Sequence, residues 1–347
     1  MRIGILKGNG IGPEITAATQ QVLTATGRLF EWVDIPIAGE AIALHGHPLP
    51  QETVEALKAV RVALKGPLIV DKLQGRLTCV HRDGTEHTYP SLNNAIRREL
   101  ALFVNPRPIL GMGALSGRHA SLDMVIMREI TEDVYIGWEH QIGDIAAEAI
   151  KLTTRVAAER VARFSFEFAR KNGRKLVTCV HKANVLNYTD GLFLRCCRDV
   201  AKEFPDIAFD DCMIDAACYH VVKNPTRFDV VCTSNQYGDI FSDLGAGLIG
   251  SLGLAPGANI GPDAAVFEAS HGAAPDIAGQ GIANPIALIL SGALLLRHVG
   301  LAADALRIER AVRAIVLAGH VLTPDLGGNA TTQHVTNAIC AELKSSS

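Results

Sequence analysis

Two aspartates with helical spacing are the first candidates for chemistry in this chain. Asp239 and Asp243 lie four residues apart in the segment NQYGDIFSD, and on a helix this spacing puts both carboxylates on one face, where they repel each other. A divalent cation between them relieves the repulsion, and such oxygen ligands suit Mg²⁺ or Mn²⁺. For this pair alone, a solvated acidic face is the alternative. Asp215, in the apolar run CMIDAAC, is a third carboxylate whose charge needs a partner or a metal ion.

Three arginines are candidates for binding acidic groups. Arg97, Arg107 and Arg128 each lie at the edge of an apolar segment. A guanidinium group binds a carboxylate through two parallel hydrogen bonds, so three such groups suit a substrate with several carboxylates. Taken singly, each arginine fits an ordinary surface or structural ion pair better.

Lys182 and Tyr135 form a candidate acid–base pair. Each follows a strand-like apolar stretch. A buried lysine can lose its proton near neutral pH, and a tyrosine can donate one. Spacing alone does not bring these two side chains together.

A glycine-rich turn follows the first expected strand. Gly8, Gly10 and Gly12 have the spacing G-x-G-x-G-P, and Pro13 occupies the position of the third glycine of a G-x-G-x-x-G motif. The pattern therefore predicts a tight turn between a strand and a helix instead of a Rossmann dinucleotide site. If a dinucleotide binds this protein, another segment must hold it.

Short apolar runs alternate with amphipathic segments, which predicts a layered α/β fold. The stretch Asp71–Pro90 is polar and has no periodicity, so we expect a long surface loop there. The expected strands are Arg2–Leu6, Glu31–Ile37, Arg61–Leu64, Leu102–Val104, Asp123–Met127, Leu176–Val180, Ile207–Phe209 and Val230–Thr233. Helices are expected from Pro13 and over Gln51–Ala59, Ala146–Lys171, Thr189–Phe204, Pro285–Val299 and Ala302–Ala318.

Composition narrows the class of protein. The 347 residues include 33 Lys and Arg against 36 Asp and Glu, a net charge of −3, which argues against nucleic-acid and membrane partners. The chain is longer than the length at which a single hydrophobic core usually stops growing, so two lobes are expected. The 8 cysteines form no C-x-x-C pair and are expected to be buried thiols of a reducing compartment. With no signal peptide or membrane-spanning run in the sequence, we expect a cytoplasmic location.

Seven motifs, in order along nearly the whole chain, carry a family resemblance. They are GNGIGPE (Gly8–Glu14), SLNNAIRREL (Ser91–Leu100), REITEDVYIGWEH (Arg128–His140), HKANVL (His181–Leu186), NQYGDIFSDLGAGLIGSLGL (Asn235–Leu254), EASHGAAPDIAGQGIANP (Glu268–Pro285) and TPDLGGNATTQ (Thr323–Gln333). Together they resemble the isocitrate and 3-isopropylmalate dehydrogenases, the β-hydroxyacid oxidative decarboxylases.

The resemblance implies an isopropylmalate dehydrogenase-like two-lobe α/β fold that is not a Rossmann fold. It implies a large cofactor-binding domain of residues 1–102 and 250–347. Residues 103–249 would form a small domain with the dimer interface and a dimer-forming clasp at residues 135–154. It also implies a homodimer with shared active sites, and higher oligomers stay open.

The family's site residues carry over to matching positions. Asp239 and Asp243 match metal ligands, and Asp215 matches the ligand from the partner subunit and a catalytic group. The remaining matches are to a partner lysine in proton transfer (Lys182), its neighbour near the substrate (Asn184), the tyrosine that protonates the enol after CO₂ leaves (Tyr135), and the clamp for substrate carboxylates (Arg97, Arg107, Arg128). The implied reaction transfers a hydride from a 2-hydroxy polycarboxylate to a nicotinamide, with Mg²⁺ or Mn²⁺ assisting loss of CO₂.

The segment HGAAPD (His271–Asp276) resembles the family's adenosine loop. NADP-dependent members typically carry Lys-Tyr where this chain has Asp276 and Ile277. An aspartate there accepts hydrogen bonds from the ribose hydroxyls and repels a 2′-phosphate, so the resemblance implies NAD. The implied cofactor-binding residues are Glu268, His271, Gly272, Ala274, Asp276, Ile277 and Asn284.

Ser91 and Asn93 match the Ser-x-Asn-x-x-x-Arg pattern of isocitrate dehydrogenases, so isocitrate is the first substrate hypothesis. Homoisocitrate, 3-isopropylmalate or another 3-alkylmalate, and a specialised analogue are the alternatives. A non-catalytic regulatory subunit is the rival class, although the chain keeps the acid–base pair and the aspartates. Departures from the family pattern favour the alternatives: Asn9 for Asp, Ile130 for Asn, Ile69 and Val70 for Thr-Thr, and a longer 71–90 loop.

Overall fold

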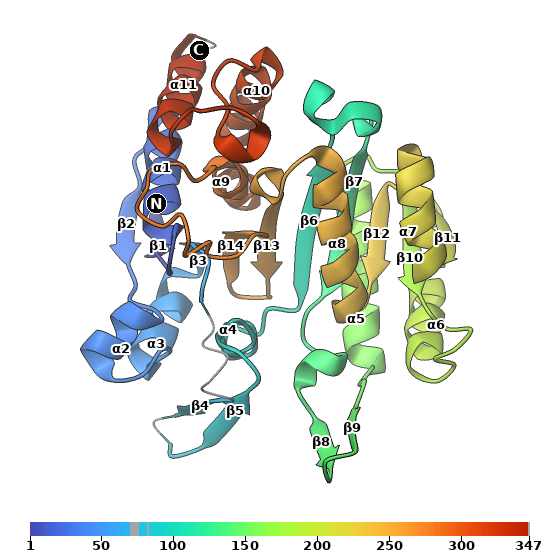
Figure 1. Ribbon diagram of the computed structural model, residues 1–347. Coiled ribbons are helices and arrows are strands. Elements are labelled where there is room, and N and C mark those ends of the chain that lie inside the picture. The colour runs from blue at the N-terminus through green and yellow to red at the C-terminus, as the bar shows by residue number, and fades with distance from the viewer. Residues whose placement is uncertain (70–75, 82, 346–347) are drawn as a thin grey trace.

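A ten-stranded sheet forms the centre of the protein (Figure 1). The computed structural model describes residues 1–69, 76–81 and 83–345. The strand order is β11-β10-β12-β7-β6-β13-β14-β3-β1-β2. We call β1, β2, β3, β13 and β14 the terminal half of the sheet, because they come from both ends of the chain. The other five strands form the central half.

Side chains from both faces of this sheet are buried. In β3, Ala63 packs in one apolar cluster while its neighbour Leu64 packs in another. The same alternation occurs in β7, where Met124 and Val125 belong to different clusters. Successive side chains of a strand point to opposite faces, so both faces are covered by helices and loops. This architecture confirms the predicted α/β layering.

We extend the name terminal half to the helices around these strands and to the separate β4–β5 hairpin; this part contains both ends of the chain (Figure 1). Its elements are β1 (Arg2–Leu6), α1 (Gly12–Ala25), β2 (Glu31–Asp34), α2 (Gly39–His45), α3 (Gln51–Val60), β3 (Val62–Lys65), β4 (Leu77–Val80), β5 (Glu86–Tyr89), α4 (Leu92–Glu99), β13 (Pro256–Ile260), β14 (Ala265–Ala269), α9 (Ile286–His298), α10 (Ala302–Ala318) and α11 (Thr332–Ser345).

The central half, with the helices around its strands and the separate β8–β9 hairpin, is built from one continuous stretch of chain. Its elements are β6 (Val104–Leu110), β7 (Asp123–Glu129), β8 (Glu139–Ile142), β9 (Ala146–Ala149), α5 (Arg155–Lys171), β10 (Leu176–His181), α6 (Thr189–Ala201), β11 (Ala208–Met213), α7 (Ile214–Lys223), β12 (Val230–Thr233) and α8 (Asn235–Ile249).

The two halves of the sheet meet at β6 and β13. These strands are antiparallel, and their ladder contains the single residue pair Val104 and Ile260. Pairing within each half is longer, as in the seven pairs that join β6 to β7. The hydrogen-bonded ladder at the junction is therefore short. The domain boundaries at residues 102–103 and 249–250 stay a prediction.

The glycine-rich segment is a tight turn between β1 and α1, as predicted. A Cβ atom on Gly8 would lie 2.2 Å from the Pro67 carbonyl oxygen, and one on Gly10 would lie 1.9 Å from the Ala273 carbonyl oxygen. Both glycines have positive φ angles, +70° and +58°. The glycines thus allow the turn to pack against its own chain.

The predicted helix Ala146–Lys171 is wrong at its beginning. Residues Ala146–Ala149 form β9, which pairs with β8 in an exposed hairpin that projects from the central half (Figure 1). The helix α5 begins only at Arg155, where the Thr154 hydroxyl caps it by accepting a hydrogen bond from the Ala157 N–H (3.3 Å). Whether this hairpin forms a dimer clasp stays a prediction.

The predicted loop Asp71–Pro90 is also partly wrong. Residues 70–75 and 82, which include Val70 and the beginning of that loop, lie outside the described residues, but β4 and β5 form an antiparallel hairpin over the rest. Its turn contains Asp83, whose carboxylate accepts a hydrogen bond from the Thr85 N–H (3.0 Å), and Gly84 with φ +81°. The missed signal was this Asp-Gly pair between two short strands.

The prediction of buried thiols holds for seven of the eight cysteines. All eight are free and Cys218 is half-buried. The reducing compartment stays a prediction. Burial raises the pKa of the Cys79 thiol to about 11, which keeps it protonated. Among the described residues, no helix combines the length and apolar character that crossing a bilayer requires. The cytoplasmic location stays a prediction.

Candidate active site

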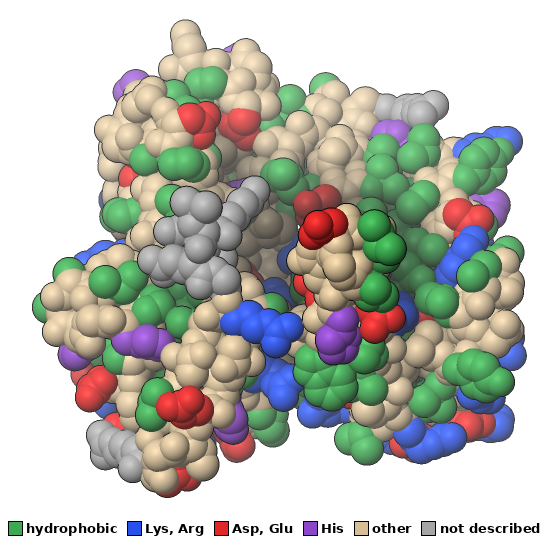
Figure 2. All heavy atoms as spheres, turned by 60° about the horizontal axis from the view of Figure 1, so that its bottom comes forward, with side chains coloured by type: hydrophobic (Ala, Val, Ile, Leu, Met, Phe, Trp, Pro, Cys, Tyr) green, Lys and Arg blue, Asp and Glu red, His purple; other side chains and the backbone are tan. Residues whose placement is uncertain are grey.

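A cavity of about 250 Å³ lies between elements of the two halves. Figure 2 shows this side of the molecule, hollowed between its left and right parts, with Lys and Arg side chains along the hollow. The terminal half contributes β3, α4 and β14, and the central half contributes β6, β7 and α8. Its lining residues are Lys65, Pro67, Leu68, Ser91, Asn93, Asn94, Arg97, Arg107, Arg128, Tyr135, Asp239, Glu268, Ala269, Ser270, His271 and Gly272.

Arg128 is fixed in the wall of this cavity by α8. Its Nη1 donates to Asp239 Oδ1, while Nε and Nη2 donate to Asn235 Oδ1 at 3.0 and 2.7 Å. The side chain is 2% exposed, and burial lowers the pKa of this guanidinium to about 9. Gly238 makes this packing possible, because a Cβ atom there would lie 2.6 Å from Arg128 Cγ.

Arg107 links β6 to the same helix. Its Nε donates to Asn105 Oδ1 (2.5 Å) and its Nη1 donates to Ser242 Oγ (2.6 Å). Nη1 also lies 3.4 Å from Asp239 Oδ1 and 3.6 Å from Asp243 Oδ1. One guanidinium therefore contacts both aspartates of the predicted metal-binding pair.

Arg97 enters the cavity from α4 and is paired with residues of β13 and β14. Its Nε donates to Asn259 Oδ1 (3.1 Å), and its Nη2 lies 3.9 Å from Glu268 Oε1. Glu268 also contacts Lys65 and accepts a hydrogen bond from Asn259 Nδ2 (2.6 Å). Burial opposes ionisation of Glu268, but the charges of Lys65 and Arg97 outweigh it and lower the pKa of this carboxyl to about 2.

Tyr135 is positioned by a short 3₁₀ turn, Val134–Ile136, after β7. Its hydroxyl donates to Asp239 Oδ2 (2.5 Å), and its carbonyl oxygen accepts from Asn94 Nδ2 (3.3 Å). Burial and the bond to Asp239 raise the pKa of Tyr135 to about 12. The phenol therefore holds its proton at neutral pH and can act as a proton donor.

Asp239 and Asp243 lie on one face of α8, as their spacing predicts. Burial opposes ionisation of Asp239, but Arg128 and Arg107 outweigh it and lower the pKa of this carboxyl. Burial raises the pKa of Asp243, whose side chain is still 55% exposed. Two carboxylates one helical turn apart, with one open to solvent, fit Mg²⁺ or Mn²⁺.

Lys182 and Asp215 do not line the cavity. Lys182 follows β10, Asp215 is in the first turn of α7, and the two form their own pair (Nζ–Oδ1 2.7 Å). Asp215 is exposed rather than buried in the apolar run that contains it, and the hydrogen bond from Lys182 lowers its pKa. Asn184 is exposed nearby in the chain. One chain therefore brings together Tyr135, the arginines and Asp239, but not these three residues.

A second cavity, of about 450 Å³, adjoins the first, since His271 and Gly272 line both. Asn284 is fixed there by Asp325, whose Oδ2 accepts from Asn284 Nδ2 (3.0 Å) and from Ser251 Oγ (2.6 Å). Asp276 is exposed and is not among the lining residues. Predicted cofactor residues in this lining are His271, Gly272, Ala274, Ile277 and Asn284, whereas Glu268 lines the first cavity.

Several side chains that hold the site were not predicted. Asn105 and Asn235 lie close in sequence to Arg107 and Asp239, and polar residues flanking a predicted site residue were the available signal. Lys65 and Asn259 belong to distant strands and had no local signal. The departures Ile130 and Asn9 lie outside the lining of the first cavity: Ile130 is fully buried in the core, and Asn9 Oδ1 accepts from the Ile69 N–H (3.1 Å).

Comparison with known proteins identifies the family. Residues 2–339 match the family model described as isocitrate/isopropylmalate dehydrogenase. The chain is 42% identical to a probable mitochondrial NAD isocitrate dehydrogenase subunit alpha of Drosophila melanogaster, covering 99% of this chain and 87% of that one. It is 43% identical to 3-isopropylmalate dehydrogenase of Archaeoglobus fulgidus, covering 99% of each.

A solved structure agrees over the whole length. The isocitrate dehydrogenase of Methylococcus capsulatus superposes with a TM-score of 0.91 at 44% identity, covering 99% of each chain. Agreement of sequence and fold over the full length confirms the two-lobe α/β fold that the motifs implied. The chain belongs to the isocitrate/isopropylmalate dehydrogenase family.

Proposed function

We propose that this chain is a metal-dependent enzyme that oxidises isocitrate with NAD and releases CO₂ and 2-oxoglutarate. The observation that supports the proposal most directly is the convergence of Arg97, Arg107 and Arg128 on one cavity with Tyr135 and Asp239. Three fixed guanidinium groups in a space of about 250 Å³ suit a small molecule with several carboxylates.

The charge balance of the cavity favours an anionic substrate. Its four cations, Lys65 and the three arginines, outnumber the carboxylates of Asp239 and Glu268 in the lining. The hydroxyl of Ser91 caps α4 by accepting from the Asn94 N–H (3.2 Å), so its own hydrogen can be donated to a substrate oxygen. With Asn93 beside it, this wall suits a third carboxylate, as isocitrate has.

The residues divide the work between binding and proton transfer. When bound, NAD supplies a hydride acceptor, and Mg²⁺ or Mn²⁺ held by Asp239 and Asp243 supplies a Lewis acid that polarises the substrate's oxygen. The arginines orient the carboxylates and keep the carboxylate that leaves as CO₂ in place. Tyr135 holds a proton on its hydroxyl and donates it to the carbon that has lost CO₂.

We further propose that a second copy of the chain completes each site with Lys182, Asp215 and Asn184. In one chain these residues are exposed or half-exposed and lie outside the cavity lining. Large apolar side chains are exposed on the same central half, which favours a contact there with another chain. They include Trp138, Ile142, Ile145, Val185, Tyr188, Tyr219 and Ile240.

We propose NAD as the cofactor because of the loop that follows His271. The second cavity lies beside this loop, and Ile277 lines it next to the exposed Asp276. A carboxylate at this edge accepts hydrogen bonds from ribose hydroxyls and repels a 2′-phosphate. The relative from Drosophila melanogaster is named as an NAD enzyme, which agrees with this choice.

A second substrate, 3-isopropylmalate, has support of its own. The relative from Archaeoglobus fulgidus is named for it, and Pro67 and Leu68 give the cavity an apolar wall. The test is a panel of isocitrate, homoisocitrate and 3-isopropylmalate with purified chain, NAD or NADP, and Mg²⁺ or Mn²⁺. We expect NADH formation to be fastest with isocitrate. If an alkylmalate were turned over faster, it would replace isocitrate as the proposed substrate. If none of the acids led to reduction of NAD or NADP, the proposal that the chain is an enzyme would be refuted.

A further inference from the structure

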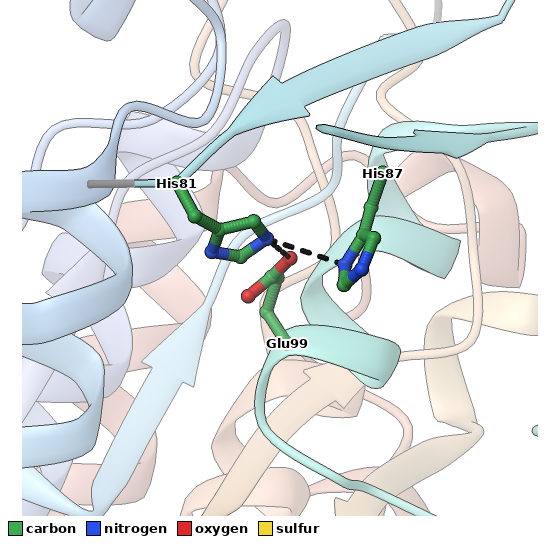
Figure 3. Close-up of side chains that lie close together, drawn as sticks. All are labelled: His81, His87 and Glu99. Carbon is green, nitrogen blue, oxygen red and sulfur yellow. Dashed lines mark hydrogen bonds and ion pairs between the residues drawn. The ribbon is translucent and has the colours of Figure 1, made fainter. Parts of the chain in front are cut away.

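Three side chains converge at the β4–β5 hairpin, outside the cavity lining. His81 follows β4, His87 is in β5, and Glu99 is the last residue of α4. His81 Nε2 lies 3.2 Å from His87 Nδ1 and 3.1 Å from Glu99 Oε1. Figure 3 shows the two imidazole rings and the carboxylate pointing toward one another.

Hydrogen bonding does not account for all of these contacts. Tyr89 OH lies 2.6 Å from Glu99 Oε1, to which it donates, and 3.2 Å from His87 Nδ1. A ring nitrogen carries at most one hydrogen, so His81 Nε2 can form a linear hydrogen bond with Glu99 or with His87 but not with both. If it donates to Glu99, the contact between the two ring nitrogens contains no shared proton. If it donates to His87, its N–H is used there and shares no proton with Glu99. If it instead accepts from the His87 Nδ1–H, the contact with Glu99 places two lone pairs together.

A bound cation removes this conflict. Zinc binds imidazole nitrogen and carboxylate oxygen at about 2.0–2.2 Å, so neighbouring ligands of a tetrahedral ion lie about 3.3–3.5 Å apart. The observed separations of 3.1 and 3.2 Å are close to this value, and all three ligand atoms lie within 4.8 Å of one another. Tyr89, which donates a hydrogen bond to Glu99, would orient the carboxylate toward such an ion without contacting the ion itself.

We propose that His81, His87 and Glu99 form a binding site for a divalent transition-metal ion such as Zn²⁺. Two imidazoles with one carboxylate favour zinc-like ions over Mg²⁺, which prefers oxygen ligands. The Glu99 side chain is 5% exposed and that of His81 is 20% exposed, whereas His87 is exposed and leaves an entry from solvent.

The ion would join the hairpin to the wall of the active site. Glu99 is the last residue of α4. The first cavity is lined by the residue that caps this helix, Ser91, and by two residues within it, Asn93 and Arg97. An ion held by Glu99 and both histidines fixes the hairpin on the last turn of α4. We therefore expect metal binding to reduce local opening of α4.

The test is a calorimetric titration of the full chain with Zn²⁺. Excess Mg²⁺ is present throughout, so that the carboxylates of α8 are already occupied and do not compete for Zn²⁺. We expect one Zn²⁺ per chain. His87→Ala and Glu99→Gln should each weaken binding by about 100-fold and Tyr89→Phe by about tenfold. Glu99→Gln keeps the side-chain shape, so circular dichroism can verify that the loss of affinity is not unfolding.

Two controls locate the ion. His320→Gln changes an exposed histidine after α10, and Asp239→Asn changes the first cavity; both should retain Zn²⁺ binding. Hydrogen exchange of the α4 amides should slow with Zn²⁺ in the wild type and not in His87→Ala. Absent Zn²⁺ binding, binding that survives His87→Ala and Glu99→Gln, or binding lost in Asp239→Asn would refute the site. Unchanged exchange in the wild type would refute the link to α4.

Discussion

The charged groups of the first cavity and the Lys182–Asp215 pair have similar chemistry in opposite surroundings. Arg107 and Arg128 are 8% and 2% exposed, and each is held by neutral partners as well as by Asp239. Lys182 and Asp215 are 26% and 65% exposed. Buried ions that are fixed from several sides keep one geometry, whereas an exposed pair is screened by water and can exchange partners at little cost.

This difference in burial distinguishes a site that is formed within one chain from a site that needs a second chain. The cavity is preorganised within one chain, because β6, β7, α4 and α8 hold its cations before a ligand arrives. Lys182 and Asp215 form an ion pair within one chain. In our proposal they become part of an active site only beside a second copy of the chain. The variants below test the two regions, from the largest expected effect to the smallest.

The largest effect is expected for Asp239→Asn, which removes the carboxylate shared by Arg128, Arg107 and Tyr135. The amide cannot balance two buried guanidinium charges and is a poorer ligand for Mg²⁺. We expect kcat/KM for isocitrate to fall at least about 1000-fold.

The matched control is Asp206→Asn, which breaks the exposed pair with Arg170. It should leave kcat/KM unchanged, because both side chains are about half exposed in the wild type. If Asp239→Asn retained metal-dependent turnover within tenfold of the wild type, its assignment as a metal ligand would be wrong.

The next effect is expected for Lys182→Met, which removes an amine that lies outside the cavity of its own chain. General acid–base groups contribute about 100- to 10,000-fold, and we expect a loss of about 100- to 1000-fold in kcat. A loss of this size from a lysine that lies outside the cavity of its own chain would itself indicate that the active site extends beyond one chain.

Mixing the two inactive variants sharpens this test. If each site takes Asp239 from one chain and Lys182 from the other, a heterodimer of Asp239→Asn and Lys182→Met has one intact site of two. Random exchange makes about half of the dimers mixed, so activity should recover to about a quarter of the wild-type value. No recovery after demonstrated subunit exchange would refute shared sites.

Glu268→Gln tests the buried ions through stability. The wild-type pKa of about 2 lies below the ordinary value of 4.5, so Glu268 stabilises the folded state fully above about pH 4.5 and loses this contribution as pH falls toward 2. We expect the variant to unfold more easily by about 3 kcal/mol at pH 7. Urea titrations at pH 7, 5 and 4 should show this difference narrowing only below about pH 4.5.

An exposed pair supplies the comparison. Glu31→Gln breaks the contact with Arg2, whose side chain is 56% exposed, and should leave the unfolding midpoint unchanged at each pH. A difference between Glu268→Gln and the wild type that grew on acidification would contradict the assigned direction of the shift.

Spacing in the sequence correctly predicted features that depend only on neighbouring residues, and it failed where pairing between strands decides the structure. Asp239 and Asp243 share a face of α8 because helical periodicity alone sets their directions. The helix expected from Ala146 began too early, since antiparallel pairing with β8 decides the state of those residues. In the same way the β4–β5 hairpin was missed although Asp83 and Gly84 signalled its turn.

The convergence of distant residues could not be read from spacing. Arg97 is held by Asn259, 162 positions away in the chain, and only the sheet brings the two together. The family resemblance placed the arginines in one site, but it left their supporting residues unnamed. Long-range contacts of this kind depend on tertiary packing, for which one sequence has no local signal.

The smallest effect is expected for Asp276→Ala, at an exposed position where solvent screens the charge. The wild type should use NAD at higher kcat/KM than NADP, and removing the carboxylate should narrow this preference by about tenfold. Asp263→Ala, at an exposed aspartate in the β13–β14 turn, should leave the ratio unchanged. Because the repulsion of a 2′-phosphate is electrostatic, the wild-type preference should also weaken at high salt. A wild type that prefers NADP would contradict the assignment of NAD.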